Sequence, residues 1–152
     1  MTETIGAGGS GAYPTKEHAM QAAADRTAAD QTAADSISDL IARIEATAES
    51  SLALDEEIAR AAGWRRHDGA WYLPGSYLMA PSDSAPRFTS SVDRAFLLLP
   101  EGWQIISMGR VSKQDVWNAC ALFEGENKKY IWSEHVFLPI TICIAALKAR
   151  FA

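Results

Sequence analysis

Four large aliphatic residues at positions 37, 40, 41 and 44 constrain the fold of this chain more than any other feature. Their spacing places Ile37, Leu40, Ile41 and Ile44 on one side of a helix. An apolar stripe of this kind has to be buried against other elements. Because no comparable stripe precedes it, we predict that the folded domain spans residues 37–152 and that residues 1–36 form a tail.

The tail has two parts of different composition. Residues 1–14 are rich in glycine and hold too few large apolar side chains to offset the entropy lost on ordering, so we predict that they are disordered. Residues 15–35 are rich in alanine and aspartate, which favours a solvated helix. The glycines of residues 6–11 match G-x-G-x-x-G, but no buried strand precedes them, so we interpret them as tail rather than as a dinucleotide-binding loop.

The composition is that of one globular domain. The chain has 152 residues, of which 48% are hydrophobic and 22% charged, and its net charge is −5. It lacks an eighteen-residue apolar run and the features of a signal peptide, so we expect a cytosolic protein without a membrane partner. Lysine and arginine are not concentrated, which disfavours duplex nucleic acid as a partner. Cys120 and Cys143 lie in apolar surroundings, as packed thiols do.

The first half of the domain contains signals for a helix and a hairpin. We predict a helix over residues 52–62 that Ser51 or Asp55 caps and that Gly63 ends in a left-handed conformation. Its buried face is expected to comprise Leu54, Ile58 and Ala61. The dipeptide Asp68-Gly69 then indicates a two-residue turn, which predicts a β-hairpin over residues 64–73.

The second half alternates loops, strands and helices. Residues 74–86 contain three prolines and are predicted to be a loop, after which Ser90 begins a helix that stops before Pro100. Three β-rich runs at 103–108, 116–123 and 130–136 suggest an antiparallel meander. A last helix runs from Pro139, with Ile140, Ile144, Leu147 and Phe151 on one stripe. These elements predict an α+β fold with a small antiparallel or mixed sheet between helices, an α-β-α layered sandwich.

Five tryptophans within 70 residues are the most unusual feature of the composition. An indole can pack in a core, stack on a ligand or lie at an interface, and core packing is the commonest of the three. Arginines near tryptophans could hold a phosphate while an aromatic face stacks a base. The candidate ligand-binding residues are Trp64, Arg65, Trp71, Arg87 and Trp103. Exposed indoles beside Arg65 or Arg87 would favour ligand binding, and buried ones would weaken it.

The sequence contains no pattern that indicates a metal site, a cofactor or a catalytic group. The three histidines, His18, His67 and His135, lie far apart, and none has a second ligand at metal-binding spacing. His67 and Asp68 could form a base and orienter for a nucleophile, Cys120 or a serine, only if folding brought these residues together. We therefore predict no catalytic residues, no metal and no cofactor.

Several blocks of the domain resemble a known family. They are DLIARIE at 39–45, LDEEIARAAGW at 54–64, PRFTSSVDRA at 86–95, LLPEGW at 98–103 and AALKAR at 145–150. The set is similar to the small phage and prophage proteins that have a phage ABA-sandwich domain. The resemblance covers about residues 37–151, although residues 104–138 match nothing in it. It implies a layered helix-sheet-helix fold and a phage or prophage context in bacteria, with no catalytic residues to transfer.

Two functions follow from these observations as expectations. The first is a non-enzymatic phage or prophage accessory protein that acts through protein-protein interaction. Its partner would be a second copy of the chain or a phage or host protein, in the cytoplasm of the bacterial host or in the virion. The alternative is a module that binds a small ligand such as a nucleotide, for example an anti-defence sponge.

Overall fold

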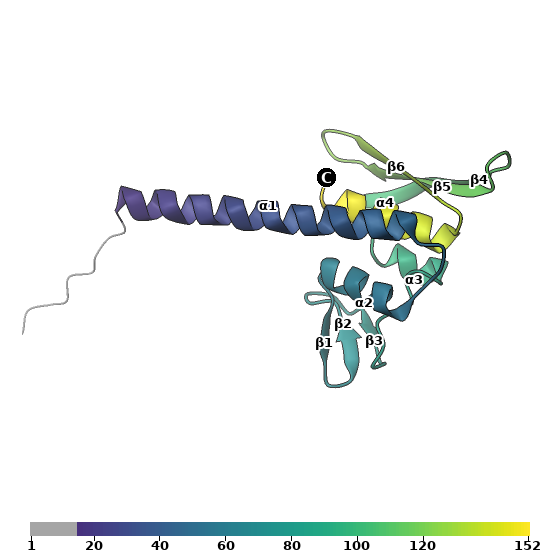
Figure 1. Ribbon diagram of the computed structural model, residues 1–152, viewed down its shortest axis with the longest axis horizontal. Coiled ribbons are helices and arrows are strands. Elements are labelled where there is room, and N and C mark those ends of the chain that lie inside the picture. Colours follow the sequence, from purple (N-terminus) through teal and green to yellow (C-terminus); the bar gives the residue numbers. More distant parts are fainter. Residues whose placement is uncertain (1–14) are drawn as a thin grey trace, which may run out of the picture. The chain divides into compact units, whose positions relative to one another are not determined.

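The computed structural model describes residues 15–152, and the chain divides after Ala33 into two compact units (Figure 1). Helix α1 (Lys16–Ala46) begins in the first unit. The Thr15 hydroxyl accepts the N–H of His18 at 3.4 Å, and the described side chains of this unit are exposed. The predicted solvated helix over residues 15–35 is confirmed. The predicted disorder of residues 1–14, with their glycine motif, lies outside the described residues.

The second unit begins at Ala34 and opens with the predicted apolar stripe. Leu40 and Ile44 are buried in its core, and Ile41 packs against the same core while half-buried. Near the end of α1, Arg43 forms an ion pair with Glu57. Ile37, the first residue of the predicted stripe, is half-buried and is not part of this core, so the stripe packs on the core from Leu40 onward.

Helix α2 (Leu52–Ala61) has the predicted cap and the predicted stop. The Ser51 hydroxyl accepts the N–H of Leu54 at 3.1 Å, which satisfies one of the free amide groups of the first turn. At the other end, Gly63 has φ +89°, and the N–H of Trp64 donates to the carbonyl of Ala59 at 2.9 Å. This left-handed ending is the conformation that glycine adopts without a Cβ clash.

Two details of α2 differ from the prediction. Ala59 is fully buried where Ala61 was expected, and Ala61 is half-buried. Asp55 is not a cap but a buried residue within the helix, because Ser51 already occupies the capping position. Leu54 and Ile58 are buried as predicted.

A small antiparallel sheet follows, formed by β1 (Arg65–His67), β2 (Ala70–Tyr72) and β3 (Met79–Ala80). The predicted hairpin is confirmed, since the turn residues Asp68 and Gly69 both have positive φ, at 48° and 74°. Strand β3 lies in the segment predicted to be a loop. Two residues are too few to show a periodic pattern in the sequence. In the structure they pair with β2, where Trp71 lies opposite Ala80 and Tyr72 opposite Met79.

Helix α3 (Val92–Phe96) begins one residue later than predicted. Its cap is Ser91 rather than Ser90, because the Ser91 hydroxyl accepts the N–H of Arg94 at 3.4 Å. Ala95 is its buried residue. The helix ends before Pro100, as expected from the sequence.

The predicted meander is confirmed as a second antiparallel sheet in the order β4-β5-β6. Its strands are β4 (Trp103–Val111), β5 (Val116–Phe123) and β6 (Lys129–His135). A register shift between Ile105 and Ser107 marks a bulge in β4. The predicted α+β class with antiparallel strands packed against helices is confirmed, although the strands form two separate sheets rather than one.

Helix α4 (Leu138–Arg150) lies between the second sheet and the helices α2 and α3 (Figure 1). Every residue from Ile140 to Leu147 is buried, so the helix has no face toward solvent over two turns. Phe151 was expected on the buried stripe, but it follows the last turn and is exposed. Within residues 15–152, no helix combines the length and the apolar character needed to cross a bilayer.

Helix α4 presents different side chains to the apolar core on one side and to the second sheet on the other. Ile140, Ile144 and Leu147 belong to the apolar core that also holds residues of α1 and α2. Thr141 faces the second sheet, since its hydroxyl donates to the carbonyl of His135 in β6 at 3.4 Å and its own carbonyl accepts the Ser133 hydroxyl at 2.8 Å. The spacing of the helix places Ala145 and Ala149 on the same side as Thr141. Small residues there allow close approach of the helix to strands β5 and β6.

We expect Ile144→Ala to lower the free energy of unfolding by about 2–5 kcal/mol, because it leaves a cavity in a fully buried site. Ile106→Ala is the matched control, because Ile106 lies on the edge strand β4 and is 48% exposed. It should cost less than about 1 kcal/mol. Urea unfolding of the three proteins measures both values. Equal losses for the two substitutions would contradict the central position of α4.

Candidate functional site

The structure does not bring His67, Asp68 and Cys120 together. His67 and Asp68 lie at the exposed end of the first sheet, with Nε2 and Oδ2 3.1 Å apart. Cys120 is buried on β5 in the second sheet, and burial raises the pKa of its thiol. A thiol of raised pKa is a poor nucleophile. These three residues therefore do not form a nucleophile, base and orienter.

His135 has a structural role at the end of β6. Its Nδ1 accepts the N–H of Phe137 at 3.1 Å, so Nε2 carries the proton of the neutral ring and donates to the carbonyl of Thr47 at 2.8 Å. The bond to Thr47 connects the end of the second sheet with the residue that follows α1. Among the described residues, no group of three or more His, Cys, Asp or Glu side chains could hold a metal ion.

The predicted ligand-binding residues are distributed over different parts of the second unit. Trp64 and Trp71 are each only 1% exposed, and Trp64 packs edge-on against Phe88 with ring centroids 5.8 Å apart. Trp103 is half-buried on β4 in the other sheet. Arg65 is exposed and donates to the carbonyl of Trp64 at 3.1 Å. Both indoles are thus core residues, and neither can stack a ligand in this structure.

Arg87 is the predicted site residue that lies in a cavity. The cavity has a volume of about 510 Å³ and is formed by the start of α2 and the segment of residues 80–94. Arg94 lines the same cavity, together with Ser82, Ser84 and Ser91. None of the tryptophans is among its lining residues, and none of the lining residues is acidic.

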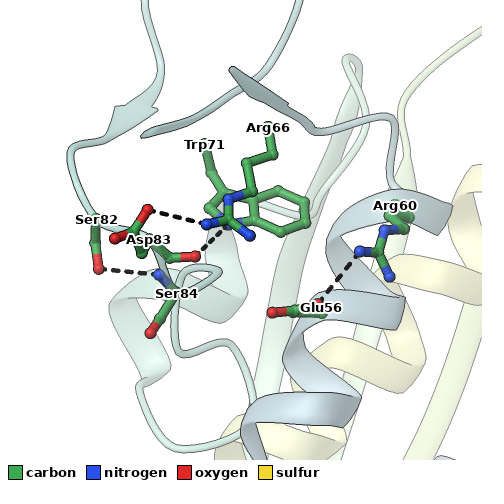
Figure 2. A network of polar contacts seen from close by, with 7 residues as sticks. All are labelled: Glu56, Arg60, Arg66, Trp71, Ser82, Asp83 and Ser84. Carbon is green, nitrogen blue, oxygen red and sulfur yellow. Dashed lines mark hydrogen bonds and ion pairs between the residues drawn. The ribbon is translucent and has the colours of Figure 1, made fainter. Parts of the chain in front are cut away.

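A polar network fixes the wall of this cavity (Figure 2). The Arg66 guanidinium forms an ion pair with Asp83 at 2.9 Å, and Trp71 Nε1 donates to the Asp83 carbonyl at 3.3 Å. On either side of Asp83, the Ser82 hydroxyl accepts the N–H of Ser84 at 3.2 Å. Because Trp71 is buried, its bond to Asp83 connects the cavity wall with the core.

Asp55 anchors the segment on the other side of Arg87. Its carboxylate accepts the backbone N–H of Thr89 at 2.8 Å, and both residues are buried. Burial raises the pKa of Asp55, while the Thr89 N–H and the charge of Arg87 act in the opposite direction. The Cys143 thiol of α4 donates to the carbonyl of Phe88 at 3.3 Å. Arg87 is therefore followed by two residues that are held in the core.

The second sheet has a face directed away from α4, which we call the outer face and define by Cys120, Leu122, Tyr130 and Trp132. Ser133 bonds to α4, so its neighbour Trp132 points to the opposite side of β6. In the register of β5 and β6, Cys120 lies opposite Trp132 and Leu122 opposite Tyr130. Trp132 is 60% and Tyr130 56% exposed, so aromatic rings remain open to solvent on this face.

Sequence reasoning missed Trp132, Arg94 and Asp55 as residues of interest. Trp132 was not among the candidate ligand-binding residues, although Glu134 lies on the same side of β6 and indicates that this side is not buried. Arg94 lines the same cavity as Arg87 because the chain turns between residue 87 and α3, and the sequence alone does not show this turn. Asp55 looked like a helix cap, and its burial depends on the distant Thr89.

A scan against protein-family models, a search of curated proteins and a search of solved structures each found no match to this chain. The resemblance to the phage ABA-sandwich domain therefore stays a prediction from the sequence blocks. The candidate sites are supported by the geometry of the chain itself.

We expect the stability conferred by Asp55 to fall as the pH rises from its ordinary pKa of 3.8. Because the folded pKa is raised, the folded protein keeps this proton to a higher pH than the unfolded chain, so rising pH favours unfolding across that window. Asp55→Asn removes the titration and keeps an oxygen that accepts the Thr89 N–H. Urea unfolding of both proteins between about pH 4 and pH 8 measures the difference. A difference that is constant, or that grows in favour of the wild type with rising pH, would contradict the assignment.

Proposed function

We propose that this chain is a non-enzymatic interaction protein that binds through the outer face of its second sheet. The observation that carries the proposal is the exposure of Trp132 and Tyr130 on that face, while Trp64 and Trp71 are buried. Indole and phenol rings have large apolar surfaces and carry much of the binding energy of protein interfaces. Their exposure on one sheet face supports burial in a complex.

The arrangement of the two rings suits a flat interface. Tyr130 and Trp132 are two residues apart on β6 and therefore point to the same side of the strand. On the neighbouring strand, Cys120 and Leu122 lie opposite them and are buried, so each ring has an apolar neighbour across the strand pair.

A second copy of the chain is the partner that the charges favour. The segment 103–136, which contains the three strands of the second sheet, has four basic and four acidic residues and therefore no net charge. Its charged residues are Arg110, Lys113, Asp115, Glu124, Glu126, Lys128, Lys129 and Glu134. A surface without net charge does not repel its own copy, and a two-fold axis through Trp132 would bury both faces at once.

The resemblance described from the sequence supports an accessory role in a phage or prophage. In that context the self-associated protein would act by holding partners together rather than by turnover. The comparisons with known proteins add no partner to this proposal, and the choice of the binding surface rests on the outer face alone.

We expect the double substitution Trp132→Ser and Tyr130→Ser to convert a dimer into a monomer, because it removes the exposed rings from the outer face. Tyr77→Ser is the matched control, since Tyr77 is a fully exposed aromatic residue outside the second sheet. Light scattering after gel filtration measures the mass of each protein at several concentrations. A wild type that is monomeric throughout, or a double variant that stays dimeric, would contradict the proposal.

A further inference from the structure

The arginines of the second unit differ in whether they have a partner. Six of its eight arginines donate to a carboxylate or to a backbone carbonyl. They are Arg43, Arg60, Arg65, Arg66, Arg110 and Arg150. Within this unit, which the structure describes throughout, Arg87 and Arg94 form neither an ion pair nor a hydrogen bond through their guanidinium groups. Both line the 510 Å³ cavity.

The cavity is positively charged in a protein that is acidic as a whole, with a net charge of −5. Asp83 in the cavity wall is paired with Arg66, and Asp55, which interacts electrostatically with Arg87, is buried and bonded to Thr89. Two guanidinium groups together carry a charge of +2, which matches a phosphate monoester better than a single carboxylate. From these observations, we propose that the cavity binds a small organic phosphate.

Hydroxyl groups in the cavity provide further donors. Ser82 and Ser91 each accept one backbone N–H, so their own hydroxyl protons can be donated to a phosphate oxygen. Ser84 also lines the cavity. Three hydroxyls and two guanidiniums supply enough donors for the oxygens of one phosphate group.

The rest of the cavity indicates what the phosphate is attached to. Its volume lies within the range of about 300–1,000 Å³ found for small-molecule sites, and is larger than inorganic phosphate requires. Apolar groups such as Leu52, Pro81 and Pro86 complete the wall. Because no aromatic ring lines it, the organic part is held without stacking, and a nucleobase is not required. A sugar phosphate is the ligand class that fits.

The site is held in place before the ligand arrives. Asp83 is bonded to Arg66 and Trp71 on one side of Arg87, and Thr89 is bonded to Asp55 on the other. A segment fixed at two points loses little further freedom on binding. The proposed site is separate from the outer face of the second sheet, so each proposal can fail without the other.

The test is a titration of the isotope-labelled full chain followed by amide NMR, with ribose 5-phosphate as the probe. We expect amides of residues 82–94 to shift with ribose 5-phosphate and, more weakly, with inorganic phosphate, but not with ribose. Adenosine 5′-monophosphate should bind within about threefold of ribose 5-phosphate, since no ring stacks the base. An absence of shifts with ribose 5-phosphate would overturn the proposal, and much tighter binding of the nucleotide would overturn the sugar-phosphate class.

Two variants locate the site. Arg87→Gln and Arg94→Gln should each weaken ribose 5-phosphate binding about tenfold or more, because each removes a charged donor. Both side chains are exposed, so the variants should keep the wild-type amide spectrum outside the segment. Arg110→Gln is the control for loss of one charge, since Arg110 pairs with Asp115 at the second sheet. An equal loss in Arg110→Gln, or none in the two cavity variants, would overturn the assignment.

Discussion

Helix α4 is buried on every side, and the rest of the folded unit depends on that burial. Its consecutive buried residues from Ile140 to Leu147 contact the aliphatic core on one side and the second sheet on the other. A helix that is apolar all round is stable only when other elements cover it completely. Neither the sheet nor the helices α2 and α3 could bury their apolar faces without it.

The same helix also fixes the two surfaces to which we assign binding. On β6, Ser133 donates to the carbonyl of Thr141, and the next residue toward the outer face is Trp132. On the cavity side, the Cys143 thiol donates to the carbonyl of Phe88, which follows Arg87 directly. Thr141 and Cys143, two residues apart on α4, thus bind the chain neighbours of Trp132 and of Arg87. Side chains supported in this way can be exposed and still be well ordered.

Local chemistry made part of this fold predictable from the sequence. The Asp68-Gly69 turn and the Gly63 stop each depend on a few neighbouring residues, and both were predicted correctly. The Ser51 cap was one of the two alternatives that the sequence offered. Strand β3 could not be predicted, because it exists only through pairing with β2. One sheet was expected where there are two, because local sequence does not show whether the hairpin and the meander pair with each other.

The candidate sites were less predictable, because each depends on contacts between distant residues. Arg87 was selected for its neighbourhood to tryptophans in the sequence, yet no tryptophan lines its cavity. The companion of Arg87 is Arg94, which the turn before α3 brings into the same cavity. For Trp132, strand alternation indicated two faces, but only the position of α4 decides which one is covered.

Amide hydrogen exchange along α4 tests the central claim most directly. If α4 is the shared core of the unit, amides from Ile142 to Leu147 should exchange only through global unfolding. Their opening free energy should then equal the free energy of unfolding measured with urea. Amides at the edge of the second sheet and in the segment of residues 80–94 should open at lower cost. Exchange of the α4 amides at a free energy well below that of global unfolding would contradict the account.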